Sequence, residues 1–362
     1  MKVSTLVVGA AMLAAPTFAE PALAGDAGPV AAAATKVFTL TKLVGDKAGA
    51  ASITDPNLVN PWGIAALSGG APWIANNGTG TSEIVEGNSG TLGSPVFLIP
   101  SPSGGVGAPT GVVAYAGTAF LVSSNGMSGS SNFIFDTEDG TILGWSPAAS
   151  SSSAVIAFDG SAQNDVFKGL ALATVGKASE LFATDFHNAQ VVIFDDKFKK
   201  IGSFTDKSAP AGYAPFNIAS IGGNLYVTFA KQDAAKHDNL DGAGAGLIDV
   251  FTTSGKLVRR LVTGGKLNAP WGLAIAPKTF GSLAGALLVG NFGDGRINAY
   301  NATTGAFVGQ MIGTNGKALV IDGLWAITVN SAGTLTFTAG TNHENDGLLG
   351  TIAPSAAAVA VR

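Results

Sequence analysis

Short runs of apolar residues recur along the chain from residue 36 onward, and each is bounded by Gly, Asn, Asp or Ser. Such runs predict β-strands joined by tight turns. One five-residue pattern (Pro, any residue, Gly, an aliphatic residue, Ala) recurs six times with variation, and its third residues lie 48, 58, 48, 55 and 51 positions apart. Repeats of this period are typical of β-propellers. The six copies are Pro61–Ala65, Pro109–Val113, Phe167–Ala171, Pro215–Ala219, Pro270–Ala274 and Ile321–Trp325.

Each copy is predicted to form the inner strand of one unit, with three further strands outside it. The sequence therefore predicts an all-β, six-bladed β-propeller with four-stranded blades. The last unit has three clear strands, ending near Leu348–Ile352. We expect Val37–Leu43 to supply its missing outer strand and to close the ring, which hides open strand edges. The predicted second strands are Trp73–Ala75, Ala119–Ser123, Leu181–Thr184, Leu225–Phe229, Leu287–Val289 and Thr334–Thr338.

The composition agrees with a turn-rich chain that has few long helices. Of 362 residues, 50 are Gly, only 12% are charged and none is Cys. The absence of Cys excludes disulfides and thiolate metal sites. The net charge is −4 and no basic block occurs, so a nucleic-acid partner is not expected. We expect a monomer.

The first residues predict export from the cytoplasm. Met1-Lys2 precedes an apolar run from Val3 to Ala15, and Ala22-Leu23-Ala24 forms an Ala-x-Ala cleavage site before Gly25. This is the layout of a secretory signal peptide, and the run is too short to span a bilayer. We therefore expect a signal peptide at 1–24, a flexible lead-in at 25–35, the propeller at 36–353 and a C-terminal tail at 354–362, in a secreted or periplasmic protein.

Several segments carry a family resemblance. Ala269–Tyr300 has the layout of the NHL-type propellers, in which P-x-G-[IL]-A is followed by a strand, Asn or Asp, and G-x-I-x-x-[FY]. The longer phrases resemble one uncharacterised family of exported bacterial propellers over about residues 36–353. Some members end in a Pro-Glu-Pro sorting tail with a membrane segment. The tail at 354–362 lacks it, so no membrane span is expected in the mature chain. The phrases lie at 54–65, 136–145, 211–218, 225–239, 267–277, 287–300 and 321–326.

Propeller geometry predicts where the working side chains lie. The loop that leads into each inner strand and the loop that joins the second and third strands open on one face, here called the leading face. Loops held by a rigid scaffold commonly carry function. Polar residues are frequent in both kinds of loop, and Lys168 lies at the start of an inner strand. The predicted second-to-third-strand loops contain all three His residues, together with Asn76, Asn77, Asn125, Asp185, Asn291 and Asp294.

A metal site on the leading face is one hypothesis. Imidazole and carboxylate groups are good ligands for zinc and related metals, and lyases with NHL-type propellers hold zinc by His near the axis. The alternative is that these side chains cap turns and bind loop backbone. The candidate ligands are His187, His237, His343, Asp185, Asp238 and Glu344.

A calcium-dependent lactonase or ester hydrolase is a second hypothesis. Gluconolactonase-type propellers place Glu, Asn and Asp around one Ca²⁺, which takes six to eight oxygen ligands. Asn60, Asn217 and Asp322 lie near the starts of inner strands and match this set by residue type, but no Glu does. The cofactor is therefore open between Ca²⁺, Zn²⁺ and none.

The third hypothesis is a binding module for a small molecule, glycan or peptide. The sequence favours this hypothesis because it contains no recognisable catalytic motif. Trp62 and Trp271 occupy the same position of the repeat. They can stack on a ligand at the channel mouth or pack between blades. Whether the protein is an enzyme stays open. The candidate ligand-binding residues are Asn60, Trp62, Asn217, Trp271, Asn291, Asp294 and Asp322.

Overall fold

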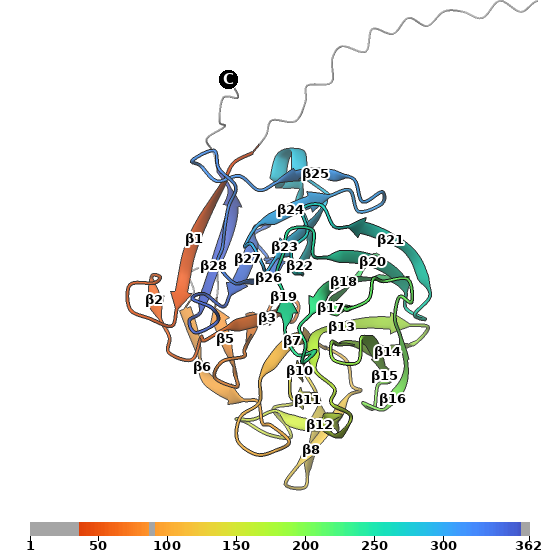
Figure 1. Ribbon diagram of the computed structural model, residues 1–362. Helices are drawn as coiled ribbons and strands as arrows, with labels where there is room; N and C mark the ends of the chain where they lie inside the picture. Colours follow the sequence, from red (N-terminus) through yellow and green to blue (C-terminus); the bar gives the residue numbers. More distant parts are fainter. Residues whose placement is uncertain (1–35, 87–90, 356–362) are drawn as a thin grey trace, which may run out of the picture. The chain divides into compact units, whose positions relative to one another are not determined.

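The computed structural model describes residues 36–86 and 91–355, which form a six-bladed β-propeller of four-stranded antiparallel sheets (Figure 1). The predicted signal peptide and lead-in, and residues 356–362 of the predicted tail, lie outside the described residues. Among the residues that are described, no helix is long and apolar enough to cross a membrane.

Blades 1 to 3 each run from the inner to the outer strand. Blade 1 contains β3 (Pro61–Ala65), β4 (Trp73–Asn76), β5 (Thr81–Glu86) and β6 (Thr91–Leu98). Blade 2 contains β7 (Pro109–Ala114), β10 (Phe133–Thr137), β11 (Thr141–Trp145) and β12 (Val155–Asp159). Blade 3 contains β13 (Phe167–Val175), β14 (Ala178–Asp185), β15 (Gln190–Phe194) and β16 (Lys200–Phe204).

Blades 4 to 6 follow the same order. Blade 4 contains β17 (Tyr213–Ile221), β18 (Asn224–Gln232), β20 (Leu247–Thr252) and β21 (Leu257–Thr263), with β19 (Asn239–Leu240) paired to β18. Blade 5 contains β22 (Pro270–Ile275), β23 (Leu287–Asn291), β24 (Ile297–Tyr300) and β25 (Phe307–Gln310). Blade 6 contains β26 (Leu324–Val329), β27 (Leu335–Ala339), β28 (Leu348–Pro354) and β1 (Phe38–Gly45), and β2 (Ile53–Thr54) pairs with β1.

The N-terminal strand closes the ring, as predicted. β1 pairs antiparallel with β28, from Phe38 opposite Pro354 to Gly45 opposite Leu348. Val44 at the far end of β1 is fully buried. The two ends of the described chain therefore complete one blade, and neither strand is left with an unpaired edge on that side.

The inner strands explain why the third residue of the repeat is Gly in blades 1, 2, 3 and 5. All six line an axial cavity of about 140 Å³. A Cβ atom on Gly63 would lie 2.7 Å from the backbone oxygen of Thr110, and one on Gly272 would lie 2.7 Å from that of Trp325. Neighbouring inner strands approach so closely at this position that a larger side chain would displace backbone.

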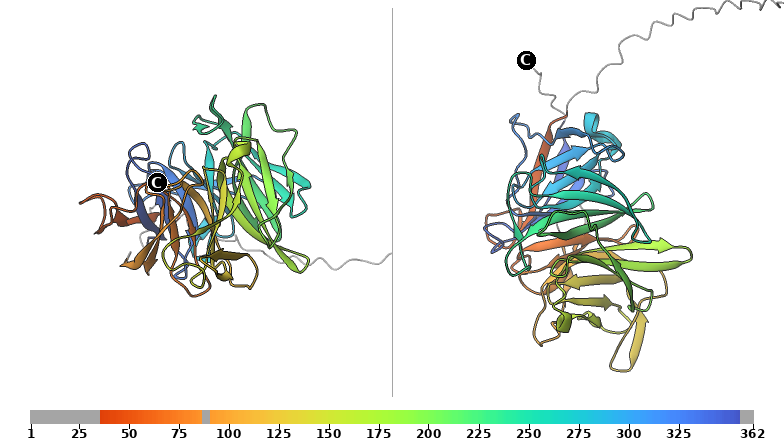
Figure 2. Two further views of the ribbon diagram at one scale, coloured as in Figure 1. Left: turned by 90° about the horizontal axis from the view of Figure 1, so that it is seen from below. Right: turned by 45° about the vertical axis from the view of Figure 1, so that its right-hand side comes forward.

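The second strand of blade 2 was predicted wrongly. It is β10, whereas the predicted segment Ala119–Ser123 runs into a separate hairpin of β8 (Leu121–Ser124) and β9 (Met127–Ser130), inserted between β7 and β10. The hairpin projects from blade 2 in the right-hand view of Figure 2 (yellow). Phe133, Ile134 and Phe135 are buried, whereas Leu121 is 63% exposed. The more apolar run therefore pairs with the inner strand, and the inserted hairpin accounts for the long 58-residue step.

Each pair of neighbouring blades shares its own hydrophobic cluster, because alternate side chains of a strand point to opposite faces of its sheet. Leu181 packs toward blade 2, and its neighbour Phe182 packs toward blade 4. Away from the axis, the cluster between blades 6 and 1, here called the seam, contains six buried side chains among the described residues, and all six are aliphatic. These are Leu43, Val44, Leu58, Ile74, Val85 and Leu349.

The ring closure predicts a large loss of stability when β1 is removed. A chain that lacks residues 36–46 as well as 1–35 should melt more than about 10 °C below a chain that begins at Lys36, because β28 and the seam lose their partner strand. Differential scanning calorimetry of the two chains measures this. Equal melting temperatures would show that β1 is dispensable for the ring.

Candidate functional site

An aromatic cluster closes one end of the axial cavity. Trp62 and Trp325 are stacked with ring centroids 3.4 Å apart, and Trp271 meets both edge-on at 5.9 Å. These three indoles occupy equivalent positions on inner strands of blades 1, 5 and 6. The cluster, here called the axial plug, consists of Trp62, Phe186, Phe216, Trp271, Phe292 and Trp325.

The plug corrects the register expected in blade 6, and it shows which of the two alternatives for Trp62 and Trp271 the structure adopts. The repeat placed Gly323 at the third position in blade 6, but Ala326 lines the cavity beside Gly63 and Gly272, so the register is three residues later. Trp62 and Trp271 are 2% and 4% exposed and pack on each other. They fill the axis and do not present a free face on which a ligand could stack.

Lys168 lies directly on the plug as a buried cation. Its side chain is 2% exposed, and its Nζ atom lies 5.3 Å from the ring centroid of Trp62 and 5.9 Å from that of Phe186. Nζ donates to Glu138 and, at 3.2 Å, to Asp238. Burial favours the neutral amine, but the two carboxylates outweigh it, so the pKa of Lys168 is raised and the ammonium remains charged.

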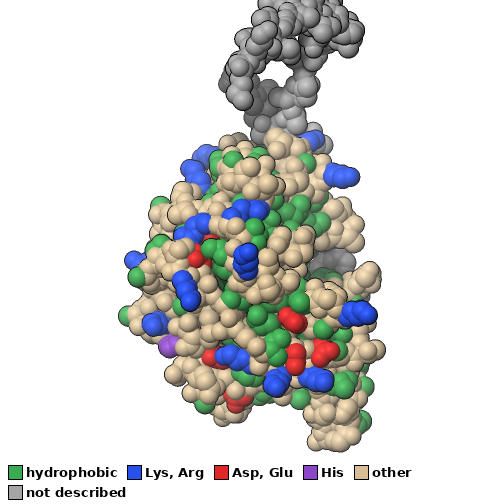
Figure 3. All heavy atoms as spheres, turned by 90° about the vertical axis from the view of Figure 1, so that its right-hand side faces the viewer, with side chains coloured by type: hydrophobic (Ala, Val, Ile, Leu, Met, Phe, Trp, Pro, Cys, Tyr) green, Lys and Arg blue, Asp and Glu red, His purple; other side chains and the backbone are tan. Residues whose placement is uncertain are grey.

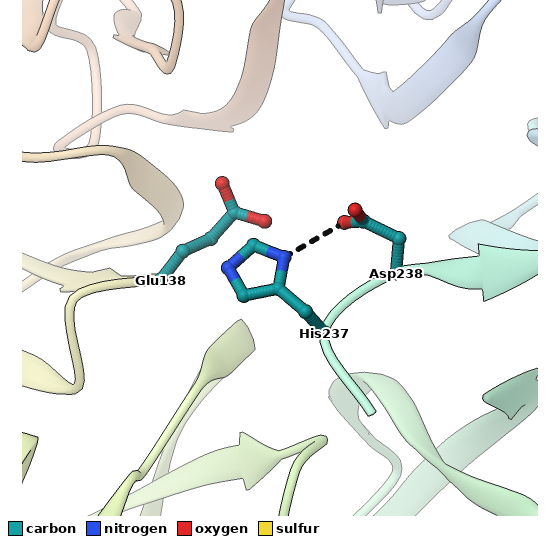
Figure 4. A group of neighbouring side chains, drawn as sticks. All are labelled: Glu138, His237 and Asp238. Atoms are coloured by element: carbon teal, nitrogen blue, oxygen red, sulfur yellow. Dashed lines mark hydrogen bonds and ion pairs between the residues drawn. The ribbon is translucent and has the colours of Figure 1, made fainter. Parts of the chain in front are cut away.

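The two carboxylates come from different blades. Glu138 is in the β10–β11 loop of blade 2, and Asp238 is in the β18–β19 loop of blade 4. Figure 4 shows both pointing toward His237, whose Nδ1 lies 3.0 Å from Asp238 Oδ1. This hydrogen bond raises the pKa of His237 and, together with Lys168, lowers the pKa of Asp238. Asp238 and His237 are exposed, so they form the accessible rim above Lys168.

A third carboxyl, Glu344, reaches the same place from blade 6. It is the last of three consecutive residues in the left-handed conformation, with φ of 54° at Asn342, 53° at His343 and 66° at Glu344. Burial and the repulsion from Glu138 raise the pKa of Glu344 to about 7. Near neutral pH Glu344 is therefore partly protonated, whereas Lys168 stays charged.

Two amides connect the acids to the plug. Asn60 accepts a hydrogen bond from Trp325 Nε1 at 2.9 Å and donates to Glu344 at 3.1 Å and to Asn77 at 3.2 Å. Asn77 donates to Glu138 at 2.8 Å. The side chains that meet here are called the axial cluster: Asn60, Asn77, Glu138, Lys168, His237, Asp238 and Glu344.

Half of the predicted metal ligands belong to this cluster and half do not. His237, Asp238 and Glu344 are members. His187 is half-buried in another loop, His343 is exposed, and the three imidazoles do not converge. Asp185 is buried in blade 3, where Asn188, Gln190 and the Val166 amide donate to it. Among the described residues, one group has metal-compatible spacing: Glu138, His237 and Asp238, with ligand atoms within 4.8 Å of one another.

Most of the other predicted ligand-binding residues hold the scaffold. Asn217 donates to the Trp271 oxygen at 2.7 Å, which links two inner strands. Asn291 donates to the Lys266 oxygen and to Asp294, and Asp294 pairs with Arg296. Asp322 accepts from the Asn342 amide at 2.9 Å. Of that set, only Asn60 belongs to the axial cluster, and Trp62 and Trp271 lie in the plug beneath it.

Sequence reasoning passed over Glu138, and it noted Lys168 and Asn77 only as polar loop positions. With the wrong second strand in blade 2, the predicted second-to-third-strand loop contained Asn125 and not Glu138. Asn125 lies in the turn between β8 and β9. The signal was nevertheless present. Residues 136–140 directly precede the third strand, as residues 185–189 do in blade 3. Comparing the units by the third strand would have placed Glu138 on the leading face.

The loop that carries Asn60 is anchored by two buried carboxyls. Asp55 begins this loop, and its Oδ1 accepts from the Asn57 amide at 2.8 Å. Glu83 on β5 is 1% exposed and accepts from Asn76 Nδ2 at 3.0 Å. Burial, together with the adjacent Asp55, raises the pKa of Glu83 to about 9. The pair therefore holds one proton at neutral pH, on Glu83.

Comparison with known proteins identifies relatives whose names state no activity. No family model matches the chain. It is 33% identical over 332 residues to an uncharacterised protein of Acanthamoeba polyphaga mimivirus, covering 88% of this chain and 81% of that one. A second uncharacterised mimivirus protein is 32% identical over 338 residues, covering 90% and 87%. These relatives are viral, so they do not support the expected bacterial origin or sorting tail.

Solved structures share the fold at low sequence identity. A streptogramin B lyase matches with a TM-score of 0.51 and 13% identity, covering 88% of this chain and 98% of that one. The soluble aldose sugar dehydrogenase of Escherichia coli matches with a TM-score of 0.52 and 13% identity, covering 88% and 100%. At this identity the likeness shows a six-bladed propeller and no more.

Replacing Glu83 by Gln should remove a pH-dependent loss of stability. In the unfolded chain Glu83 ionises above about pH 4.5, whereas in the folded chain it keeps its proton up to about pH 9. The unfolded state is therefore favoured progressively as pH rises across this window. Gln cannot ionise, so the variant should gain more than about 1 kcal/mol over the parent between pH 5 and pH 8.5 in urea unfolding. A constant difference between the two proteins would contradict the raised pKa.

Proposed function

Because this chain belongs to the same family as the two uncharacterised mimivirus proteins, whose names state no activity, we propose its function from the axial cluster itself. The protein binds a small molecule that carries a positively charged group, an ammonium or a guanidinium, at the centre of the leading face.

The balance of charge at the axis supports this proposal most directly. Three carboxyls, Glu138, Asp238 and Glu344, face a single buried ammonium. Lys168 is paired with Glu138 and Asp238, so Glu344 has no cation of its own and takes up a proton near neutral pH. A second positive group beside Glu344 would relieve that repulsion and hold the carboxylate ionised.

Backbone strain in the Glu344 loop also supports a binding function for the axial cluster. Loops from blades 1, 2, 4 and 6 and the start of β13 in blade 3 meet there, and the Glu344 loop contains three non-Gly residues in the left-handed region. Each such residue costs roughly 1 kcal/mol. Backbone strain of this kind is concentrated at functional sites. Packing does not require it, because the plug beneath is already closed by aromatic contacts.

The plug also limits the kind of ligand. It closes the axis beneath Lys168, so a ligand cannot thread through the channel. Access is from the rim, where Asp238 and His237 are exposed. A compact cationic group that reaches Glu344 past these two side chains fits this arrangement. A free amine and a Lys or Arg side chain of a peptide share that chemistry.

Binding should couple to the proton on Glu344. A cation prefers the ionised carboxylate, so below pH 7 part of the binding free energy is used to remove the proton. Protonation of His237, whose pKa is raised, acts in the same direction because it adds a positive charge. Affinity for a cation should therefore rise with pH up to about 7 and level off above it.

We expect tyramine to bind more tightly than N-acetyltyramine, its uncharged analogue, in isothermal titration calorimetry at pH 7.5. Glu344→Gln should weaken binding about tenfold and reduce the rise in affinity between pH 6 and 7.5 to the part that comes from His237. Glu180→Gln, at the opposite end of blade 3, should bind like the parent. Equal affinity for the two analogues, or no binding of either in a panel of amines and guanidines, would contradict the proposal.

A metal-dependent hydrolase or lyase is the second candidate, because Glu138, His237 and Asp238 have ligand spacing. Three protein ligands of mixed N and O type suit Zn²⁺. For Ca²⁺ the oxygen ligands are too few. The Lys168 ammonium already pairs with both carboxylates, and it would repel a divalent cation placed between them.

The dialysed protein should therefore hold less than one equivalent of zinc by elemental analysis. Stoichiometric zinc that is lost in His237→Ala and kept in His187→Ala would favour the metal-dependent enzyme and count against binding of a cationic ligand.

A further inference from the structure

A second cavity lies at the seam, on the face opposite to the axial cluster. Its volume is about 610 Å³, within the range typical of small-molecule sites. It is bounded by the β3–β4 loop of blade 1 and by the end of β26 with the following loop of blade 6. The axial cluster is at the loops that lead into β3 and β26, so the two sites are at opposite ends of these strands.

The cavity lies where the contact between blades 6 and 1 has no aromatic side chain among its described buried residues, because the stacked Trp62 and Trp325 join these blades only at the axial end. Each of the other five clusters includes aromatic side chains. Between blades 1 and 2, for example, Trp73 is stacked on Phe97 and Phe133 at 4.3 and 4.2 Å. Between blades 5 and 6, Phe280 and Phe337 are fully buried. The six described buried residues of the seam are all aliphatic.

The lining of the cavity is uncharged. Ile64, Leu67, Val85 and Leu349 supply apolar surface, and no described residue that lines it is ionisable. Asn330 is occupied, because it donates to Thr334 and Thr336. Thr328 and Thr351 bring two hydroxyls to the wall. Transfer of a charge into such a site without a partner is costly.

We propose that the seam cavity binds an uncharged aromatic molecule bearing a hydroxyl or carbonyl group, as a ligand site separate from the axial cluster. The ring of the ligand takes the place that aromatic side chains occupy in the other five contacts, and the hydroxyls of Thr328 and Thr351 recognise its polar group. Because the ligand contacts blades 1 and 6 together, its binding stabilises the closed ring.

Three compounds with the same naphthalene ring test whether the cavity prefers an uncharged ligand. They are the neutral 2-naphthol, the anionic 2-naphthoate and the cationic 2-naphthylmethylammonium. With the full chain at pH 7, 2-naphthol should raise the melting temperature and bind with a dissociation constant at least tenfold lower than either charged analogue. Binding is measured by the change in naphthol fluorescence. Failure of 2-naphthol to bind, or equal affinity for all three, would overturn the proposal.

Matched variants locate the site. Val329→Asp puts a charge on a lining residue that is 42% exposed, and it should weaken 2-naphthol binding at least tenfold. Val308→Asp, at a valine that is 44% exposed on β25, should leave binding unchanged. Ala71→Phe places a ring in the cavity from the β3–β4 loop, so it should abolish binding while keeping the fold. Unchanged affinity in both Val329→Asp and Ala71→Phe would place the ligand elsewhere and overturn the assignment.

Two further comparisons exclude other occupants. If the full chain does not bind 2-naphthol but a chain beginning at Lys36 does, residues of the N-terminal segment fill the cavity and the small-molecule assignment is wrong. Glu344→Gln should bind 2-naphthol like the parent. A loss of binding in that variant would mean that the naphthol is held at the axial cluster, which also overturns the proposal.

Discussion

The pairing of β1 with β28 is the constraint on which the rest of the structure depends. It ties the start of the described chain to its end and so closes the six sheets into a ring around one axis. Only in a closed ring do loops from blades 1, 2, 4 and 6 reach the start of β13 in blade 3. Glu138 and Glu344 are separated by about two hundred residues, yet they lie close enough that burial and the charge of Glu138 together raise the pKa of Glu344.

At the axis, a positively charged side chain is buried against aromatic rings. Aromatic side chains fill the space where the inner strands converge, and a buried Lys168 lies on top of them. A cation in that position is stable only with carboxylates around it. Those carboxylates then repel a third, Glu344. On the face shown in Figure 3, by contrast, acidic and basic side chains are interspersed among uncharged surface. The axial cluster has more carboxyls than cations because loops from several blades bring their acidic side chains to one point.

The two ends of the inner strands differ in charge: one end carries ionisable side chains and the other does not. The leading face collects ionisable groups, because polar loops from several blades converge there near the axis. The seam at the other face is uncharged and lined by aliphatic side chains. It is also the one contact between blades that the chain closes with its two ends. A propeller of this kind can therefore offer one site that depends on pH and one that does not.

The sequence by itself determined the blade count, the strand order of most blades and the ring closure, because strand periodicity and turn residues are local properties. It also placed His237, Asp238, Glu344 and Asn60 in loops of the leading face. It misplaced the second strand of blade 2, because a run of alternating residues can form an inserted hairpin as readily as a blade strand. Only the tertiary structure decided that Glu138 and Lys168 meet Asp238, that His187 and His343 stay apart, and that Trp62 packs against Trp325. Distances across an axis depend on how far each loop reaches inward, and no single loop sequence contains that information.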